Sequence, residues 1–333
     1  MSAAPGPHSS AHGVGADSPA GSPATTLADD IAAAAQLACL LEASAPKPGN
    51  VSPGRHFHDT RYEDFLASTA AIGGALARAG DRTQTLGGTI LEAIRATARW
   101  TSSNTNLGIV LLLAPLAHAA HEACRRKQGE GVAAHELPEE QPRKQLREQL
   151  ARVLRSTTVR DAAHVYEAIR IAHPAGLGKV DNEDVAAAPT IALRDAMALA
   201  ADRDGIAREY ATDFAITFET GASALARARR EGLPWDDSVL ECYLTLLAAA
   251  PDTHIERKLG RAAAVDVSER ARATLAAGGV RTAAGRDSIA LLDRQLRDER
   301  NSRNPGTTAD LTAAAIYVVL LEEKLQPSSD GNH

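Results

Sequence analysis

The residues best suited to chemistry lie in short polar segments that interrupt an apolar, alanine-rich chain. The first segment, residues 47–59 (KPGNVSPGRHFHD), combines prolines and glycines with cationic, imidazole and carboxylate side chains. Three more segments are residues 104–108, 251–260 and 304–311, and residues 173–185 form a weaker fifth. Each segment precedes or opens a predicted helix, where free N–H groups and the helix dipole favour anions. We therefore expect the five segments to converge on one cleft.

The two histidines of the first segment allow three interpretations. In an extended backbone His56 and His58 point to the same side, and Asp59 follows them directly. A metal site, a hydrogen-bonded His–Asp pair and an ordinary polar loop all fit these residues. The residues alone do not choose among the three.

The later polar segments also have a purely structural interpretation. Thr307 and Asp310 have the spacing of a capping box, in which two side chains satisfy the free N–H groups of a helix start. Residues 253–256 repeat this spacing, and so do Thr26 and Asp29, which lie outside any polar segment. Asp310 is therefore a candidate helix cap as well as a candidate site residue.

The composition predicts an all-α protein. Of the 333 residues 44% are hydrophobic and only 3% are aromatic, so the core must consist of small and aliphatic side chains, which pack as closely spaced helices. We expect one globular domain of about ten helices, because apolar residues recur at helical spacing. The predicted helices cover residues 26–44, 61–79, 85–100, 107–126, 158–172, 190–203, 206–231, 236–250, 254–277, 284–299 and 308–325.

The remaining segments define the expected domain boundaries. Residues 1–25, rich in Pro, Gly, Ser and Ala, predict a disordered tail, and residues 327–333 a flexible one, which leaves 26–326 as the domain. Residues 127–150 are polar and predict an exposed excursion with a short helix. The apolar run 107–120, at about fourteen residues, is too short to span a bilayer.

Charge and cysteine content restrict the class of protein further. The net charge is −6, and no stretch dense in Lys and Arg indicates nucleic-acid binding. The three cysteines, Cys39, Cys124 and Cys242, lack metal-site spacing and predict free thiols. The first residues do not resemble a signal peptide, so we expect a cytoplasmic protein without a membrane partner. The sequence leaves open whether it forms a homo-oligomer.

Together the five segments resemble the triphosphoribosyl-dephospho-CoA synthase family, most closely its archaeal-type branch. KPGNVSPGRHFHD, NTNLGIVLLLAPLA, HPAGLG, PDTHIERKLG and NPGTTADLTAA occur in the family's order, over roughly residues 30–325. The resemblance implies an all-helical transferase that joins ATP to 3′-dephospho-CoA and releases adenine. The triphosphoribosyl group moves to a ribose 2′-hydroxyl, which gives a prosthetic-group precursor.

The motifs depart from those of citrate-cluster members at two places. Asn50 to Arg55 replace the end of a Lys-Pro-Gly-Leu-Val-Asp motif, and Asn106 and Leu107 stand where those members typically have His and Lys. Loss of a lysine beside a polyphosphate site can change the substrate. The same glycosyl transfer to another cofactor precursor is therefore an alternative.

The reaction that the resemblance implies assigns roles to the polar residues. Breaking a ribose–adenine bond builds positive charge that a carboxylate stabilises, and a base must take the acceptor's proton. The triphosphate calls for Mg²⁺, which prefers oxygen ligands. The expected catalytic residues are Asp59, His58 and Asp310, and the expected metal ligands are Asp59, Asp252 and Asp310. The expected substrate-binding residues are Lys47, Gly49, Asn50, Arg55, Asn104, Asn106, Gly108, Lys179, Arg257 and Asn304, with Lys47, Arg55 and Arg257 facing phosphate.

Two other classes of protein compete with this transferase. A metal-dependent phosphohydrolase of the HD type is also all-α and uses a His–Asp pair, although it carries the pair on a helix. A non-catalytic nucleotide-binding module is the third class. Their products differ, since the three classes give free adenine, inorganic phosphate and unchanged ATP respectively.

Overall fold

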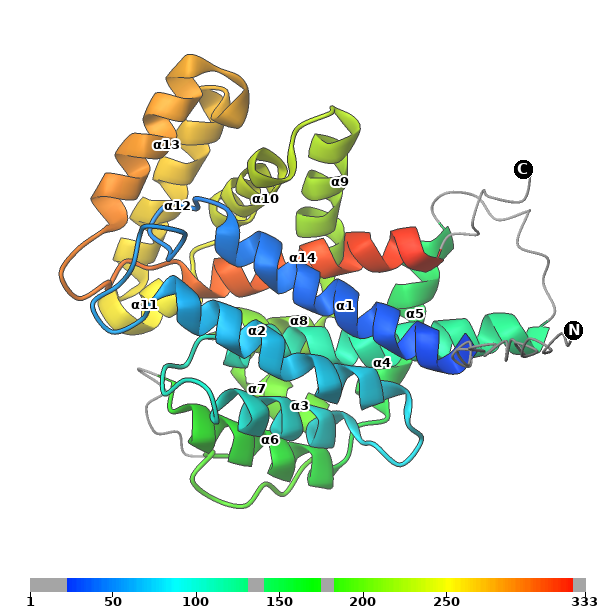
Figure 1. The fold of residues 1–333 in the computed structure, drawn as a ribbon. Helices are drawn as coiled ribbons and strands as arrows, with labels where there is room; N and C mark the ends of the chain where they lie inside the picture. Colours follow the sequence, from blue (N-terminus) through cyan, green and yellow to red (C-terminus); the bar gives the residue numbers. More distant parts are fainter. Residues whose placement is uncertain (1–22, 131–140, 175–182, 326–333) are drawn as a thin grey trace, which may run out of the picture.

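Alanine-rich apolar segments form the helices, and prolines and glycines end them. The computed structural model describes residues 23–130, 141–174 and 183–325, and these residues form helices and loops without a β-strand (Figure 1). The helices are α1 (Pro23–Ser44), α2 (Tyr62–Ala77), α3 (Leu86–Thr97), α4 (Leu107–Glu130), α5 (Gln141–Arg155), α6 (Val159–Ala172), α7 (Leu193–Ala200), α8 (Gly205–Ala211), α9 (Ala222–Arg230), α10 (Trp235–Ala249), α11 (Thr253–Leu259), α12 (Arg261–Ala276), α13 (Ala283–Leu296) and α14 (Gly306–Leu325). A π-helical turn (Ile216–Gly221) and two 3₁₀ turns (Arg78–Gly80, Gly279–Arg281) join them.

The all-α class is confirmed, but the described residues form 14 α-helices instead of about ten. The predicted helix 206–231 is divided into α8, the π-helical turn and α9, because Asp213 and Phe214 take positive φ angles of 50° and 59°. The predicted helix 254–277 is divided into α11 and α12 at Gly260, whose φ is 85°. A positive φ interrupts a right-handed helix, and both breaks lie inside stretches that the sequence predicts as single helices.

The predicted exposed excursion at 127–150 is partly wrong. Helix α4 continues to Glu130, and α5 begins at Gln141 and buries Leu146, Leu150 and Leu154 completely. These leucines recur every fourth residue, so one narrow stripe of a largely polar helix enters the core. Residues 131–140 and the predicted terminal tails lie outside the described residues, apart from the first turn of α1.

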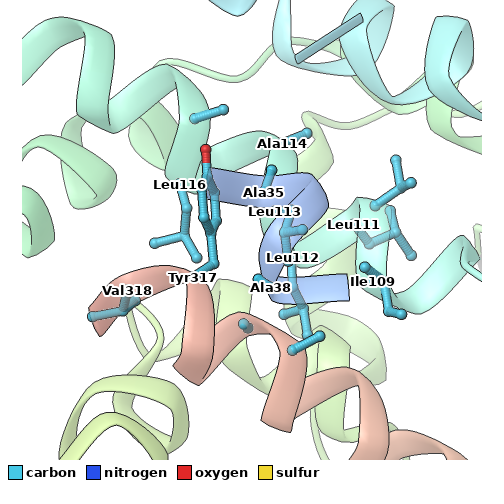
Figure 2. Packing of buried hydrophobic residues seen from close by; sticks show 14 of the residues in the cluster. Ala35, Ala38, Ile109, Leu111, Leu112, Leu113, Ala114, Leu116, Tyr317 and Val318 are labelled. Atoms are coloured by element: carbon cyan, nitrogen blue, oxygen red, sulfur yellow. The ribbon is translucent and has the colours of Figure 1, made fainter. Parts of the chain in front are cut away.

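Small side chains let α1, α4 and α14 pack closely at the centre of the molecule (Figure 1). Ala35 and Ala38 of α1 lie beside Leu112 and Leu113 of α4 and Tyr317 of α14, and all five are fully buried (Figure 2). The predicted aliphatic core is confirmed. The expectation that the apolar run 107–120 is too short to span a bilayer is wrong, because α4 continues past residue 120 and is long and apolar enough to cross a membrane. Of its apolar window, however, 78% is buried inside the protein.

A second, smaller hydrophobic cluster joins α10, α11, α12 and α13. Tyr243, Leu247, Ile255, Leu292 and Leu296 belong to it and are almost completely buried. In Figure 1 the α12–α13 pair projects from the central helices. This cluster provides the surface on which the first polar segment rests.

The close contact between α3 and α6 leads to a stability prediction. The Gly87 N–H donates to Asp161 Oδ1 at 2.8 Å, and a Cβ at Gly87 would lie 2.4 Å from the Asp161 carbonyl oxygen. Gly87→Ala must push two backbones apart, so it should destabilise the fold by about 1–3 kcal/mol. Gly88→Ala is the matched control, because its nearest neighbour is a side chain at 3.2 Å. It should be neutral or stabilising, by up to about 1 kcal/mol.

Urea unfolding of both variants measures the difference. Equal midpoints for the two variants would show that the α3–α6 contact is not as tight as the structure has it.

Candidate functional site

A cavity of about 360 Å³ lies where the polar segments meet. All five predicted segments contribute to its wall, so their expected convergence is confirmed. The volume is within the range of small-molecule sites, about 300–1,000 Å³. From the segments the lining comprises Asn50, Val51, Asn104, Thr105, Asn106, Leu107, Gly108, Pro174, Glu183, Asp184, Val185, His254, Arg257, Asn304, Gly306, Ala309 and Asp310.

The cavity has an apolar side and a polar side. Helices α6, α7 and α8 supply the apolar side, which includes Val165, Ile169, Leu193, Met197 and Ile206. The polar side consists mainly of residues at or near the starts of α4, α8, α11 and α14. Such a cavity suits a ligand with a flat or aliphatic part joined to an anionic part.

Asp310 is a cavity residue and not a helix cap. Helix α14 begins at Gly306, so Asp310 is its fifth residue, and the Thr307 hydroxyl is paired with the Thr253 hydroxyl at 3.0 Å. The predicted capping box with Thr307 is therefore wrong. Among the described residues no donor bonds the Asp310 carboxylate, which lies so close to Gly108 that a Cβ there would be 2.0 Å from Oδ2.

The electrostatic surroundings of Asp310 oppose its ionised form. Burial raises the pKa of Asp310 well above its ordinary value, and the negative charges of Glu42 and Asp252 raise it further. A carboxylate without a donor and beside other carboxylates favours a proton or a cationic ligand. This is the arrangement expected of a functional carboxylate.

Both carboxylate oxygens of Asp252 accept hydrogen bonds, and these bonds hold two helices together. Its Oδ1 accepts from the His254 and Ile255 N–H groups at 2.8 and 3.1 Å, which caps α11. Its Oδ2 accepts from both the N–H and the hydroxyl of Thr308 at 2.7 Å, in the first turn of α14. The helix cap is thus Asp252, one residue before the capping box predicted at 253–256. Asp252 is buried and absent from the cavity wall, so the structure does not place it as the metal ligand that we expected.

The cations and the glycine of the first segment do not face the cavity. Lys47 is completely buried and pairs with the Glu42 carboxylate at 2.9 Å. The Arg55 guanidinium pairs with Asp293 at 2.8 Å, and the Gly49 N–H donates to the same Asp293 at 2.9 Å. The structure therefore corrects the expectation that these three residues contact phosphate, because each is occupied by a partner within the protein.

Residues of α10 and α13 anchor this segment, and sequence reasoning missed them. The Tyr243 hydroxyl donates to the Pro48 carbonyl at 2.7 Å and accepts from Asn50 Nδ2 at 2.9 Å. The Arg297 guanidinium donates to the Asn50 carbonyl at 2.8 Å and also pairs with Asp293. Between 193 and 247 residues separate these partners along the chain, so no local pattern could indicate them. Asn50 remains on the cavity wall, as expected.

His58 and Asp59 lie on the surface, outside the cavity wall. Their side chains are 64% and 63% exposed, and 3.8 Å separates His58 Nε2 from Asp59 Oδ2, which is too long for a hydrogen bond. The structure does not bring them together with Asp310 as catalytic or metal-binding groups. They occupy a loop and not a helix, so they also lack the placement of an HD-type metal centre.

Five of the expected substrate-binding residues do line the cavity besides Asn50. Asn104 accepts the Leu107 N–H at 3.2 Å and so caps α4, while still reaching the cavity. Lys179 lies outside the described residues. The five are Asn104, Asn106, Gly108, Arg257 and Asn304.

Four buried polar atoms of the cavity wall lack a partner within the described residues. They are Thr105 Oγ1, His254 Nε2, Arg257 Nε and Asn304 Oδ1. Burial lowers the pKa of His254 to about 3, and the neighbouring Lys258 and Arg257 add to this shift. At neutral pH the imidazole is thus uncharged. Unpaired buried groups carry a free-energy cost that a bound polar ligand can remove.

Sequence reasoning missed several charged or ionisable residues of the cavity wall, and His254, Asp204 and Glu42 are three of them. His254 lies inside a segment that we had singled out, so its imidazole beside Asp252 was a usable signal. Asp204 caps α8, pairs with Arg257 and lines the cavity, but it has no motif around it. Glu42 lines the cavity from the last turn of α1, five residues before Lys47, and looked like an ordinary helix-surface residue.

The fold is all-α, and a cavity of nucleotide size lies at several helix starts. Together these two features define a class of all-α proteins with a nucleotide-sized site. Residues 28–329 match the model of the ATP:dephospho-CoA triphosphoribosyl transferase (CitG) family. The chain belongs to this family, and the resemblance seen in its five segments is confirmed.

Individual relatives support the assignment over different spans. A protein of Pseudomonas paraeruginosa, provisionally named a 2-(5″-triphosphoribosyl)-3′-dephosphocoenzyme-A synthase, is 36% identical over 115 residues, 34% of this chain and 39% of that protein. One from Stutzerimonas stutzeri with the same name is 31% identical over 124 residues, 37% of this chain and 41% of that protein. These matches span about two fifths of the relatives' length.

A solved structure extends the likeness across most of the fold. The Archaeoglobus fulgidus protein, provisionally described as a triphosphoribosyl-dephospho-CoA synthase, matches with a TM-score of 0.56 and 29% identity. The match covers 77% of this chain and 98% of that chain.

The four hydrogen bonds of Asp252 predict a structural effect of its removal. Asp252→Ala leaves buried donors of α11 and α14 unpaired, so it should cost about 2–4 kcal/mol of unfolding free energy. Asp298→Ala is the matched control. Asp298 also accepts from two backbone N–H groups and a hydroxyl, but it lies on the exposed surface, where water can replace it. Equal urea midpoints for the two variants would contradict the structural role.

The raised pKa of Asp310 predicts a stability cost that depends on pH. Well below the ordinary value of 3.8 both the folded and unfolded states are protonated. As pH rises through the raised folded pKa, the folded state holds a proton longer than the unfolded state, so the free energy of unfolding falls. Asp310→Asn removes this cost, so its Tm should exceed the wild-type Tm at neutral and higher pH.

The Tm difference should shrink as pH falls toward the ordinary carboxyl pKa. Asp29→Asn, at an exposed carboxylate of α1, should show no such trend. A Tm difference for Asp310→Asn that stays constant across the pH series would contradict the raised pKa.

Proposed function

We propose that this protein transfers the triphosphoribosyl group of ATP to a ribose 2′-hydroxyl of a 3′-dephospho-CoA-like acceptor and releases adenine. Family membership supports this class of reaction. The observation that carries the proposal at the level of the site is Asp310. It is a carboxylate without a hydrogen-bond donor among the described residues, on the wall of a cavity of nucleotide size.

The reaction exchanges one bond at the ribose C1′ for another. The C1′–N9 bond breaks and its electron pair leaves with adenine, while the acceptor hydroxyl oxygen forms the new bond to C1′. The acceptor's proton passes to a base and finally to the adenine. Positive charge develops on the ribose between these events, and a carboxylate nearby lowers the energy of that transition state.

The cavity offers few cations for a triphosphate. Its lining includes Arg203 and Arg257, and Arg257 already pairs with Asp204. The start of α4 adds N–H groups, because neither Gly108 nor Ile109 uses its N–H for a hydrogen bond within the described residues. These N–H groups favour the binding of anions, because they lie at the positive end of the dipole of a 24-residue helix.

We also propose that Mg²⁺ enters with the triphosphate. The described residues contain no group of three or more His, Cys, Asp and Glu side chains that could hold a metal. This fits Mg²⁺, which is commonly held by one or two carboxylates together with substrate phosphates. Of the three expected ligands, Asp310 is the one on the cavity wall. Bound there, the ion would offset the negative charge of the triphosphate.

Asp310→Asn tests the proposal, because asparagine keeps the shape of the side chain and removes its charge. Adenine released from ATP, with Mg²⁺ and dephospho-CoA present, should fall about 10²–10³-fold, the usual effect of losing one such electrostatic contact. Asp29→Asn should keep wild-type activity. Mass spectrometry of the products measures adenine and the acceptor adduct together.

The product mixture also decides among the competing classes. Adenine with a different cofactor precursor would identify another acceptor. Inorganic phosphate without adenine would indicate a phosphohydrolase, and unchanged ATP a binding module.

A further inference from the structure

Glu42 is another carboxylate of the cavity wall, and its partner is a buried lysine. It lies in the last turn of α1, is 3% exposed, and lines the same cavity as Asp310. Its Oε1 is 2.9 Å from the Nζ of Lys47, which is itself fully buried. Lys47 Nζ also donates to the backbone carbonyls of Glu42 and Ala45. All contacts of this ammonium thus lie within one turn of chain.

The second oxygen of Glu42 is left for the cavity. No described residue donates a hydrogen bond to Oε2, whereas the carboxylate of Asp252 accepts four such bonds. The negative charges of Glu42 and Asp310 both raise the pKa of the buried Cys39, one turn before Glu42, and the charge of Glu42 also raises the pKa of Asp310. Glu42 and Asp310 therefore line the same cavity, and of these two only Glu42 forms an ion pair within the described residues.

A purely structural role explains this pair poorly. A buried ion pair is commonly no more stabilising than apolar residues of similar size, because desolvation offsets the attraction. The pair also closes no distant contact, since residues 42 and 47 are neighbours along the chain. What the pair does accomplish is to fix a charged carboxylate at the cavity wall in a place with little water.

We propose that Glu42 stabilises the positive charge that develops on the ribose when its bond to adenine breaks, and that Lys47 is the positioning residue for Glu42. This inference rests on the proposed function, whose transition state carries that charge. Glu42 forms no bond in the step. The C1′–N9 electron pair leaves with adenine and the acceptor oxygen supplies the pair for the new bond. A fixed carboxylate in a low-dielectric site exerts more stabilisation than one in water.

The activity test uses a single and a double variant. Glu42→Gln should lower kcat for adenine release about 10²–10³-fold with little change in KM for ATP, because the charge acts mainly in the transition state. It also leaves the Lys47 ammonium buried without its partner carboxylate, which can unfold the protein. The double variant Glu42→Gln with Lys47→Met removes both charges at nearly constant volume, so it should fold with a Tm close to wild type.

The double variant separates the two roles. If the pair is catalytic, the folded double variant remains as inactive as Glu42→Gln. If the pair is only structural, the double variant regains wild-type turnover, and the proposal is overturned. A variant that keeps full turnover at saturating Mg²⁺, but needs more Mg²⁺ to reach it, would make Glu42 a metal ligand and overturn the proposal as well.

A binding measurement tests the charge directly, without turnover. The first probe is 1,4-dideoxy-1,4-imino-D-ribitol 5-triphosphate, whose ring nitrogen is protonated and carries a positive charge. The second is 1,4-anhydro-D-ribitol 5-triphosphate, whose ring is uncharged. Calorimetry in EDTA measures the affinity for each probe. The wild type should bind the probe with the cationic ring more tightly, and the double variant should lose most of this preference. An unchanged preference would refute the role of Glu42.

The wild-type arm keeps failure of the inference distinct from failure of the proposed function. If the wild type releases no adenine with any acceptor, the proposed function fails first. If the wild type releases adenine and the double variant does so equally well, only the assignment of Glu42 fails.

Discussion

The site depends on one buried carboxylate that ties together the starts of two helices. Asp252 accepts two hydrogen bonds from the start of α11 and two from the first turn of α14. These two helices carry His254 and Asp310, which both line the cavity. Burial raises the pKa of Asp252, and the four hydrogen-bond donors offset part of this shift. Any displacement of Asp252 would move the cavity residues of both helices.

The first polar segment shows how charged loop residues can serve the fold instead of a ligand. Its glycine, lysine and arginine bond to Asp293 and Glu42, and Tyr243 clamps its backbone. Gly49 must be glycine here, since its φ is 74° and a Cβ would lie 2.8 Å from Leu296. A loop with many backbone polar groups can be buried only if each finds a partner. The helix breakers thus allow the chain to turn, and the charges let the turn be buried beside the cavity.

Local patterns predicted the helices and the meeting of the segments, but not the direction of individual side chains. Helical periodicity located most elements, and the preference of polar residues for helix starts correctly predicted one cleft. Whether Lys47 or Glu42 faces that cleft depends on which face of α1 packs against α14, and this is a tertiary property. The capping-box pattern at Thr307 failed for a related reason. Asp252, more than 50 residues earlier in the chain, already satisfies the N–H of Thr308, so α14 needs no cap of its own.

The cavity carboxylates reveal a balance between stability and binding. Asp310 has no donor among the described residues, and Glu42 and Asp252 both oppose its ionisation. Four polar atoms of the same wall are also unpaired in the part of the chain that the structure describes. Each such group costs folding free energy in the empty protein, so a ligand that supplies positive charge and hydrogen bonds recovers that energy on binding. A cavity with only a structural role would destabilise the fold less if its wall were apolar, because burial of unpaired polar groups does not stabilise the fold. The unpaired polar groups are concentrated at the helix starts, where the five segments meet. This distribution indicates a binding site for a charged ligand and argues against a packing defect.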